Sequence, residues 1–143
     1  MNPYDKLIAR KRKWTPVAVE GGPVAEGTED AISRCLALRC LEIPVGDFIK
    51  EATAKEIPEH AKKILSMNIT DEENHDVALN YVAATYKVAP ETEAEARRIA
   101  EAWISHPDHP IVKAMVLERS IFFTILPFFR AFGNAGMRTT SAD

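Results

Sequence analysis

Apolar residues recur at steps of three and four along most of this chain, which is the period of amphipathic α-helices. Four segments carry the pattern, at residues 29–48, 58–87, 92–105 and 111–132. No segment of useful length alternates apolar and polar residues with the period of two that a half-buried β-strand requires, and no internal repeat is present. The sequence therefore predicts an all-α fold.

Proline and glycine residues indicate where these helices should bend or end. Pro44 and Gly46 are expected to kink or stop the first helix, and Asp47 can cap a second piece that continues through Ala54. Pro127 is expected to kink the last helix.

The segment at residues 58–87 allows two interpretations. Thr70 and Glu73 form a capping-box pattern, which would start a new helix near Asn68. The apolar stripe, however, continues through this point without a shift of phase. We therefore favour a single long helix from Pro58 to Lys87.

The two ends of the chain differ from its helical middle. Residues 1–28 contain three prolines and three glycines and are expected to form an extended N-terminal arm with little regular structure. Residues 29–136 form the expected helical domain, and residues 137–143 form a C-terminal tail. The basic run from Arg10 to Lys13 is interpreted as a solvated part of the arm rather than as a nucleic-acid contact.

The composition excludes several classes of protein. Lys and Arg total 18 while Asp and Glu total 21, and this net charge of −3 excludes a polyanion binder driven by bulk charge. No apolar run reaches the roughly 18 residues that a membrane-spanning helix needs. Cys35 and Cys40 have the spacing of neither a metal knuckle nor a disulfide framework, so we expect a reducing, cytoplasmic location.

Three glutamates and a histidine stand where the helical pattern calls for apolar residues. Glu72 and His75 are three residues apart, which places them on one helix face within a stripe of leucine, isoleucine and valine. Glu118 interrupts the apolar stripe of the last helix, and Glu42 that of the first. Because burying an unpaired carboxylate is costly, three helices that each direct an acid inward suggest a shared metal ion.

Carboxylates combined with imidazole suit iron or manganese, and facing helices of a bundle hold dinuclear sites of this kind. The full pattern is one Glu from each of two helices and a Glu-x-x-His from each of the other two. The residues that match three of these four helices are Glu42, Glu72, His75 and Glu118. Asp47 and Glu51 are rival ligands from the first helical region. The alternative is that these acids reach water at the edges of their stripes.

Two stretches resemble the small subunit of ribonucleotide reductase, a ferritin-like, radical-generating chain. Residues 71–76 are similar to the family's first Glu-x-x-His helix, and residues 117–134 are similar to its next ligand helix, a Glu followed by an aromatic-rich run. The resemblance covers residues 30–136. It implies a ferritin-like bundle, a dinuclear iron or manganese centre that activates oxygen, and a larger catalytic subunit that makes deoxyribonucleotides. Where the family commonly has its radical tyrosine, one helical turn after the ligand histidine, this chain has Leu79.

No second Glu-x-x-His follows Glu118, so the ferritin-like bundle and its site are expected to be incomplete in this chain. Our first hypothesis is that a second chain carrying that helix completes a reductase-like site. The second is a metal-binding oxidase in which two copies share ligands across a homodimer interface. The third is a helical interaction module without enzymatic activity, whose Phe-rich last helix docks a partner.

Overall fold

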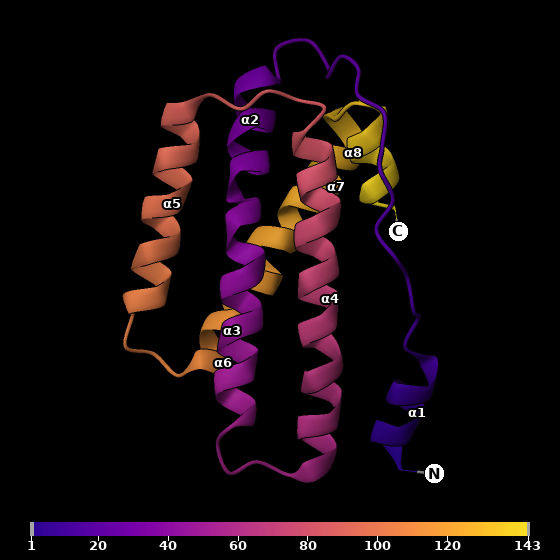
Figure 1. Cartoon of the computed structure of the whole chain (residues 1–143), viewed down its shortest axis with the longest axis vertical. Helices are drawn as coiled ribbons and strands as arrows, with labels where there is room; N and C mark the ends of the chain where they lie inside the picture. The colour runs from indigo at the N-terminus through magenta and orange to yellow at the C-terminus, as the bar shows by residue number, and fades with distance from the viewer. Residues whose placement is uncertain (1, 143) are drawn as a thin grey trace.

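The computed structural model describes residues 2–142, and all regular secondary structure in that range is helical (Figure 1). The α-helices are α1 (Pro3–Arg10), α2 (Glu29–Ala37), α3 (Glu42–Thr53), α4 (Glu59–Ala83), α5 (Pro90–Ser105), α6 (Pro110–Val116), α7 (Phe123–Phe132) and α8 (Ala135–Thr140). The 3-10 helix η1 (Leu38–Leu41) joins α2 to α3, and the π-helix η2 (Leu117–Phe122) joins α6 to α7. The prediction of an all-α fold is confirmed. No described helix combines the length with the apolar composition that a membrane crossing requires.

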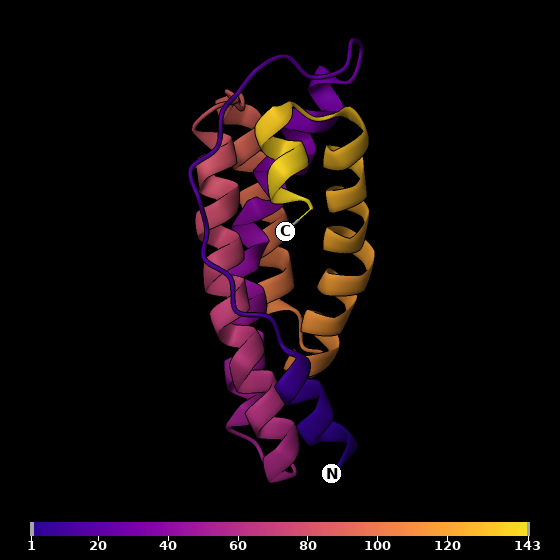
Figure 2. The same ribbon diagram turned by 90° about the vertical axis from the view of Figure 1, so that its right-hand side faces the viewer.

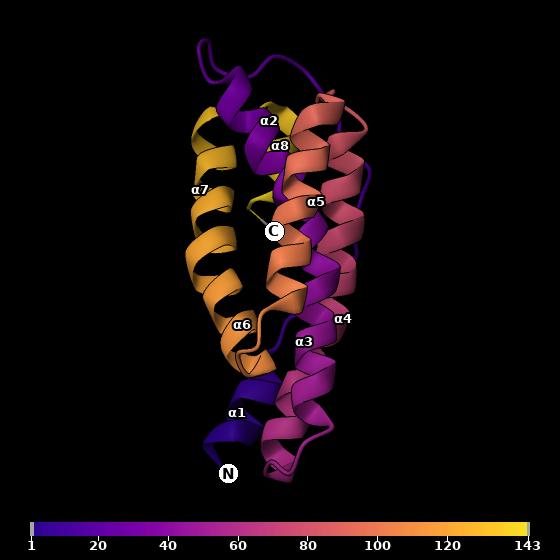
Figure 3. The same ribbon diagram turned by 90° about the vertical axis from the view of Figure 1, so that its left-hand side faces the viewer.

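The longer helices run side by side in an elongated bundle. α2 and α3 follow one another along a single rod, with α4 packed against α3 and α5 packed against α2 (Figure 1). A second rod, made of α6, η2 and α7, contacts both α2 and α3, and Figure 3 shows it on the side of the molecule away from α4. α8 contacts α4 and α7 and lies between them at one end of the bundle (Figure 2).

Two hydrophobic clusters hold these helices together. The first cluster joins η1 and α3 to α5, α6 and η2, and its fully buried members are Leu41, Val45 and Leu117. The second joins α2, α4, α7 and α8, and its fully or almost fully buried members are Ile32, Leu36, Val82, Phe129 and Met137. The apolar stripes of the sequence therefore face the interior, as amphipathic helices require.

The first helical segment breaks earlier than the sequence predicts. The break is the 3-10 turn at Leu38–Leu41, while Pro44 and Gly46 lie inside α3 and do not end it. Pro44 is the third residue of α3, and the first backbone N–H groups of a helix have no intrahelical partner, so proline is tolerated there. The expectation that Asp47 caps a new helix is also wrong, because α3 begins at Glu42 and Asp47 lies inside it.

The prediction of a single helix through this segment is confirmed, but the helix ends at Ala83 and not at Lys87. α4 runs without interruption from Glu59 to Ala83, and Thr70 and Glu73 both lie within it. The capping-box interpretation is therefore wrong, and Glu72 does not stand at a frayed helix start. This matters for the site, since a continuous helix holds Glu72 and His75 on one face.

The last helix is distorted before Pro127 rather than at it. Pro127 lies inside α7, which continues around it to Phe132, whereas η2 has the wider π-helical hydrogen-bonding pattern. Such π-segments are rare, and they occur frequently at functional sites. Here the π-segment contains Glu118.

Both ends of the chain carry a short helix that was not expected, while residues 11–28 of the arm have neither helix nor strand, as predicted. Residues 3–10 form α1, which packs on α4, and the arm then runs along α4 (Figure 2). Residues 137–140 of the tail belong to α8, where Met137 is fully buried and Asn134 caps the helix by accepting a hydrogen bond from the Met137 N–H. A Cβ on Gly136 would lie 2.5 Å from the carbonyl oxygen of Glu20, so only glycine allows the arm to approach α8 this closely.

Lys113 of α6 is only 5% exposed although it carries a charge. Its Nζ donates hydrogen bonds to the carbonyl oxygens of Ile104 (3.3 Å) and His106 (3.1 Å), at the C-terminal end of α5. The same Nζ lies 4.2 Å from the centroid of the Phe48 ring on α3. Because the C-terminal end of a helix carries partial negative charge, this lysine ties α5 to α6 and α3.

We expect Lys113→Met to lower the free energy of unfolding by about 1–3 kcal/mol, because two part-buried carbonyl oxygens lose a charged donor. Urea denaturation followed by circular dichroism measures the change. Lys63→Met, which removes an exposed lysine from α4, is the matched control and should alter stability by less than about 0.5 kcal/mol. Equal stability of the two variants would contradict the assigned role of Lys113.

Candidate metal centre

The predicted ligands come from two packed helices and the π-segment. Glu42 is the first residue of α3, Glu72 and His75 lie on α4, and Glu118 lies in η2. Glu42 and Glu72 are 3% and 4% exposed, so both acids are directed into the bundle and do not reach water at its edge. One ligand atom from each of Glu42, Glu72 and His75 lies within 4.8 Å of the others, and this group can hold a metal ion.

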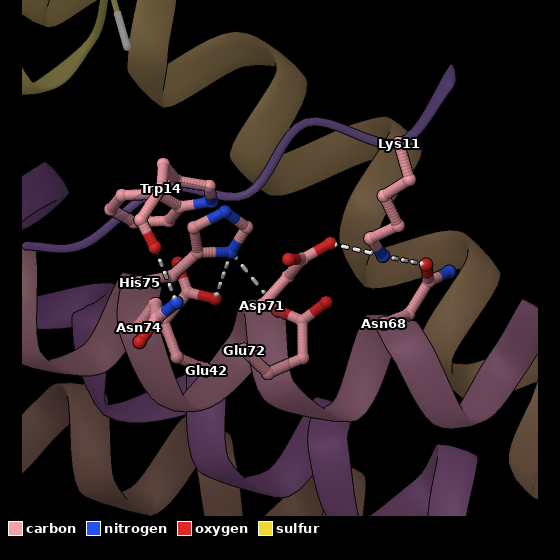
Figure 4. Close-up of polar contacts among 8 residues, drawn as sticks. All are labelled: Lys11, Trp14, Glu42, Asn68, Asp71, Glu72, Asn74 and His75. Carbon is pink, nitrogen blue, oxygen red and sulfur yellow. Dashed lines mark hydrogen bonds and ion pairs between the residues drawn. The ribbon is translucent and has the colours of Figure 1, made fainter. Parts of the chain in front are cut away.

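The imidazole of His75 faces the two buried carboxyl groups (Figure 4). Its Nδ1 lies 3.3 Å from Glu72 Oε2 and 3.5 Å from Glu42 Oε2. The three-residue step along α4 brings Glu72 and His75 together, whereas Glu42 meets them only because α3 packs on α4. Nδ1 is therefore the nitrogen available for coordination beside the acids.

Glu118 completes the acidic wall of the site without joining the tight group of three. It lines the same pocket as Glu42 and His75 and is half-buried. Among the described residues, Glu118 Oε1 and Glu42 Oε2 are buried side-chain oxygens without a hydrogen-bond partner. Buried polar atoms are normally satisfied, so these two oxygens fit a site that takes a cation.

Burial and mutual contact shift the ionisation of these groups. Burial raises the pKa of Glu42 from 4.5 to about 8, with a further rise from the neighbouring Glu72 and opposition from His75. Burial and the charge of Glu72 raise the pKa of Glu118 to about 7. Burial acts to lower the pKa of His75, but the close contacts of its imidazole with the Glu42 and Glu72 carboxyl groups outweigh it and raise that pKa to about 10. In the metal-free chain these groups therefore retain protons near neutral pH, and the protons neutralise the buried acids as a bound cation would.

The N-terminal arm covers the exposed side of His75. The Trp14 ring stacks on the His75 imidazole with 5.4 Å between the ring centroids, and Asn74 Nδ2 donates to the Trp14 carbonyl oxygen at 3.2 Å (Figure 4). Lys11 forms an ion pair with Asp71 and donates to Asn68 Oδ1 at 2.8 Å. The interpretation of the basic run as a solvated segment is therefore wrong for Lys11, which is held against α4.

Sequence reasoning did not identify Trp14 as a site residue. The one available signal was a lone tryptophan directly after the basic run, in a segment otherwise poor in aromatic residues. Nothing in that pattern indicates which helix the ring will meet. Its contact with His75 depends on the path of the whole arm along α4.

The rival ligands lie away from this group. Asp47 is exposed and forms an ion pair with Lys50 at 3.6 Å, and Glu51 is exposed on α3. The other histidines have separate contacts, since His60 stacks on Tyr4 and His109 caps α6. Within residues 2–142, a group of three candidate metal ligands forms only at Glu42, Glu72 and His75.

Gly46 allows α3 and α4 to approach each other beside the ligands. A Cβ on Gly46 would lie 3.4 Å from the Cβ of Glu72, so alanine just fits and anything larger pushes on the ligand. We expect Gly46→Ala to keep wild-type stability or gain slightly, because glycine is unfavourable inside a helix. Gly46→Val should cost about 1–3 kcal/mol by overpacking. Thermal denaturation of both variants tests this, and a Val variant as stable as the Ala variant would contradict the close contact.

Comparison of the chain with protein-family models, curated proteins and solved structures gives no match. The resemblance to the ribonucleotide reductase small subunit therefore rests on the sequence stretches around Glu72 and Glu118, and it stays a prediction.

Proposed function

We propose that this chain is the metal-binding part of a dinuclear carboxylate protein of the ribonucleotide reductase small-subunit type. The observation that carries the proposal is the convergence of Glu42, Glu72 and His75 from two helices into one buried group. Burying two carboxyl groups side by side destabilises a fold unless a cation or protons neutralise them. A divalent metal with oxygen and imidazole ligands provides that neutralisation directly.

The donor set favours iron or manganese. Three carboxylates and one imidazole nitrogen are hard and borderline ligands, which suit these metals better than thiolate-seeking ions. Glu42, Glu72 and His75 would hold the first metal, and Glu118 would contribute to a second. Such a centre, when bound, supplies oxygen activation, which in the resembled family supports the making of deoxyribonucleotides by a larger subunit.

A second chain is proposed to supply the remaining ligands. The sequence contains a single Glu-x-x-His, so a dinuclear centre needs further donors from outside these residues. A groove of about 400 Å³ adjoins the ligands and is lined by Glu72, His75, Glu118, Arg119 and Phe123, among others. The Phe123 ring is 70% exposed at this groove, and a partner helix that covers it would also reach Glu118.

The test is an anaerobic titration of the metal-stripped chain with Mn²⁺ and with Fe²⁺. We expect one metal ion per chain in the monomer, and for Mn²⁺ the six-line electron paramagnetic resonance spectrum of an isolated ion. Adding a chain that carries the second Glu-x-x-His helix should raise the content to two ions with a coupled spectrum. Binding of neither metal would refute the proposal.

Two outcomes separate the proposed partner chain from self-association. Two metal ions in a monomeric chain, with sedimentation equilibrium run in parallel, would contradict the need for any second chain. Two metal ions in a tight homodimer would contradict a different partner chain and favour shared ligands between copies.

A further inference from the structure

A small pocket with apolar walls lies next to the ligand group. It has a volume of about 120 Å³ and is formed where α4, η2, α7 and α8 meet. Its walls are Ala78 and Leu79 of α4, Phe122 of η2 and Leu126 of α7. The metal site makes no use of these four side chains, so the proposed function leaves the pocket unexplained.

One end of the pocket is polar. Glu42, His75 and Glu118 line it there, and Glu42 Oε2 and Glu118 Oε1 are buried oxygens without a hydrogen bond. Apolar walls combined with a few convergent polar atoms are the usual features of a small-molecule site. Glu42 and Glu118 contribute oxygens at this end and His75 contributes its imidazole, so a hydroxyl group, which can both donate and accept a hydrogen bond, suits it.

The rim of the pocket is built from both ends of the chain. Trp14 of the arm and Thr140 and Ser141 at the end of α8 also line the pocket. These residues are close in space only because the arm and α8 pack against the same side of α4 (Figure 2). The pocket is therefore a product of the full fold and encloses its contents on several sides.

We infer that this pocket binds a small neutral molecule with an apolar body of at most one six-membered ring and one hydrogen-bond donor, such as a phenol. The size limit follows from the volume, since an apolar cavity of about 150 Å³ holds benzene. The hydroxyl group faces Glu42 and Glu118, each of which has a buried oxygen without a hydrogen bond at this end of the pocket. Binding does not require a metal ion, because the four apolar walls are outside the ligand group.

The inference is tested on the EDTA-treated full chain by titration with phenol, followed in ¹H–¹⁵N correlation spectra. We expect saturable shifts centred on the amides of Ala78, Leu79 and Leu126. Benzene, which lacks the hydroxyl group, should bind at least about tenfold more weakly, and 2-naphthol should not bind because of its size. Absence of saturable shifts with phenol, or shifts centred elsewhere in the fold, would overturn the inference.

Two variants fill the pocket from different walls. Ala78→Leu and Leu126→Phe should each weaken phenol binding at least about tenfold, whereas the control Ala84→Leu, at an exposed position on the end of α4, should bind as the wild type does. Leu126 is only half-buried, so a larger side chain is tolerated there more easily than at the buried Ala78. The Leu126→Phe variant therefore tests the inference even where Ala78→Leu fails to fold. Unchanged binding in a folded Leu126→Phe variant would overturn the assignment. Metal titration of the same samples reports separately on the proposed function.

Discussion

Glu72→Gln is expected to weaken Mn²⁺ binding by about 100-fold or more, since even partners that only support a metal ligand contribute about 10- to 100-fold. The amide keeps the size of the side chain but removes the negative charge, and Glu72 is the acid nearest to His75 Nδ1, at 3.3 Å. His75→Ala should have an effect of similar size, because it removes the imidazole nitrogen of the group. Isothermal titration of the metal-stripped proteins measures both losses.

The neighbouring Glu73 provides a matched control for this result. Its side chain is 58% exposed and lies 3.8 Å from Lys50, outside the ligand group. Glu73→Gln should keep wild-type affinity for Mn²⁺, and circular dichroism should show the same helix content in both variants. Equal affinities for Glu72→Gln and Glu73→Gln would contradict the assignment of Glu72 as a ligand, whatever the identity of the metal.

The metal-free protein is expected to lose stability as the pH rises from about 5 to 8, with Glu42 as the main cause. Folding raises the pKa of Glu42 from 4.5 to about 8, so within this window the folded chain holds a proton that the unfolded chain has released. The free energy of unfolding therefore falls with pH, by about 1 kcal/mol for each pH unit. The raised pKa values of Glu118 and His75 act in the same direction, the latter from about 6.5 to 10.

Glu42→Gln isolates the contribution of this carboxyl group. The free energy of unfolding of the variant should match that of the wild type near pH 5, where Glu42 is protonated in the folded chain. It should exceed the wild-type value near pH 8, because glutamine removes the destabilising ionisation of the buried carboxyl group. Urea denaturation in EDTA across this range measures the difference. Glu101→Gln, on the exposed side of α5, is the control, and its free energy of unfolding should change with pH as that of the wild type does. Wild-type stability that rises between pH 5 and 8 would contradict the ionisation described for the site.

Metal binding should show the opposite dependence on pH. A cation displaces the protons held by Glu42 and Glu118, so its apparent affinity rises as the pH increases toward the pKa values of about 8 and about 7. The same substitution that stabilises the metal-free chain at high pH, Glu42→Gln, should therefore lower its affinity for metal. This trade between stability and binding is the expected signature of a buried functional carboxylate.

The helical period was sufficient to predict the all-α class and the long helix α4, because periodicity depends on residues close together in the chain. It did not locate the break at Leu38–Leu41 or the π-segment around Glu118. The predictions based on Pro44 and Pro127 were wrong. Pro44 lies in the first turn of α3, where proline is tolerated, and α7 continues past Pro127. Local residue preferences are small, and tertiary packing overrides them.

Local sequence was enough to predict that Glu72 and His75 share a helix face and that acids replace apolar residues on three stripes. The packing of the helices and the arm was needed to show that Glu42 meets these two residues, that Asp47 and Glu51 do not, and that Trp14 covers His75. The physical reason is distance along the chain. A three-residue step on one helix is set by backbone geometry, whereas contacts across helices depend on how α3, α4 and the arm pack together, which no local pattern encodes.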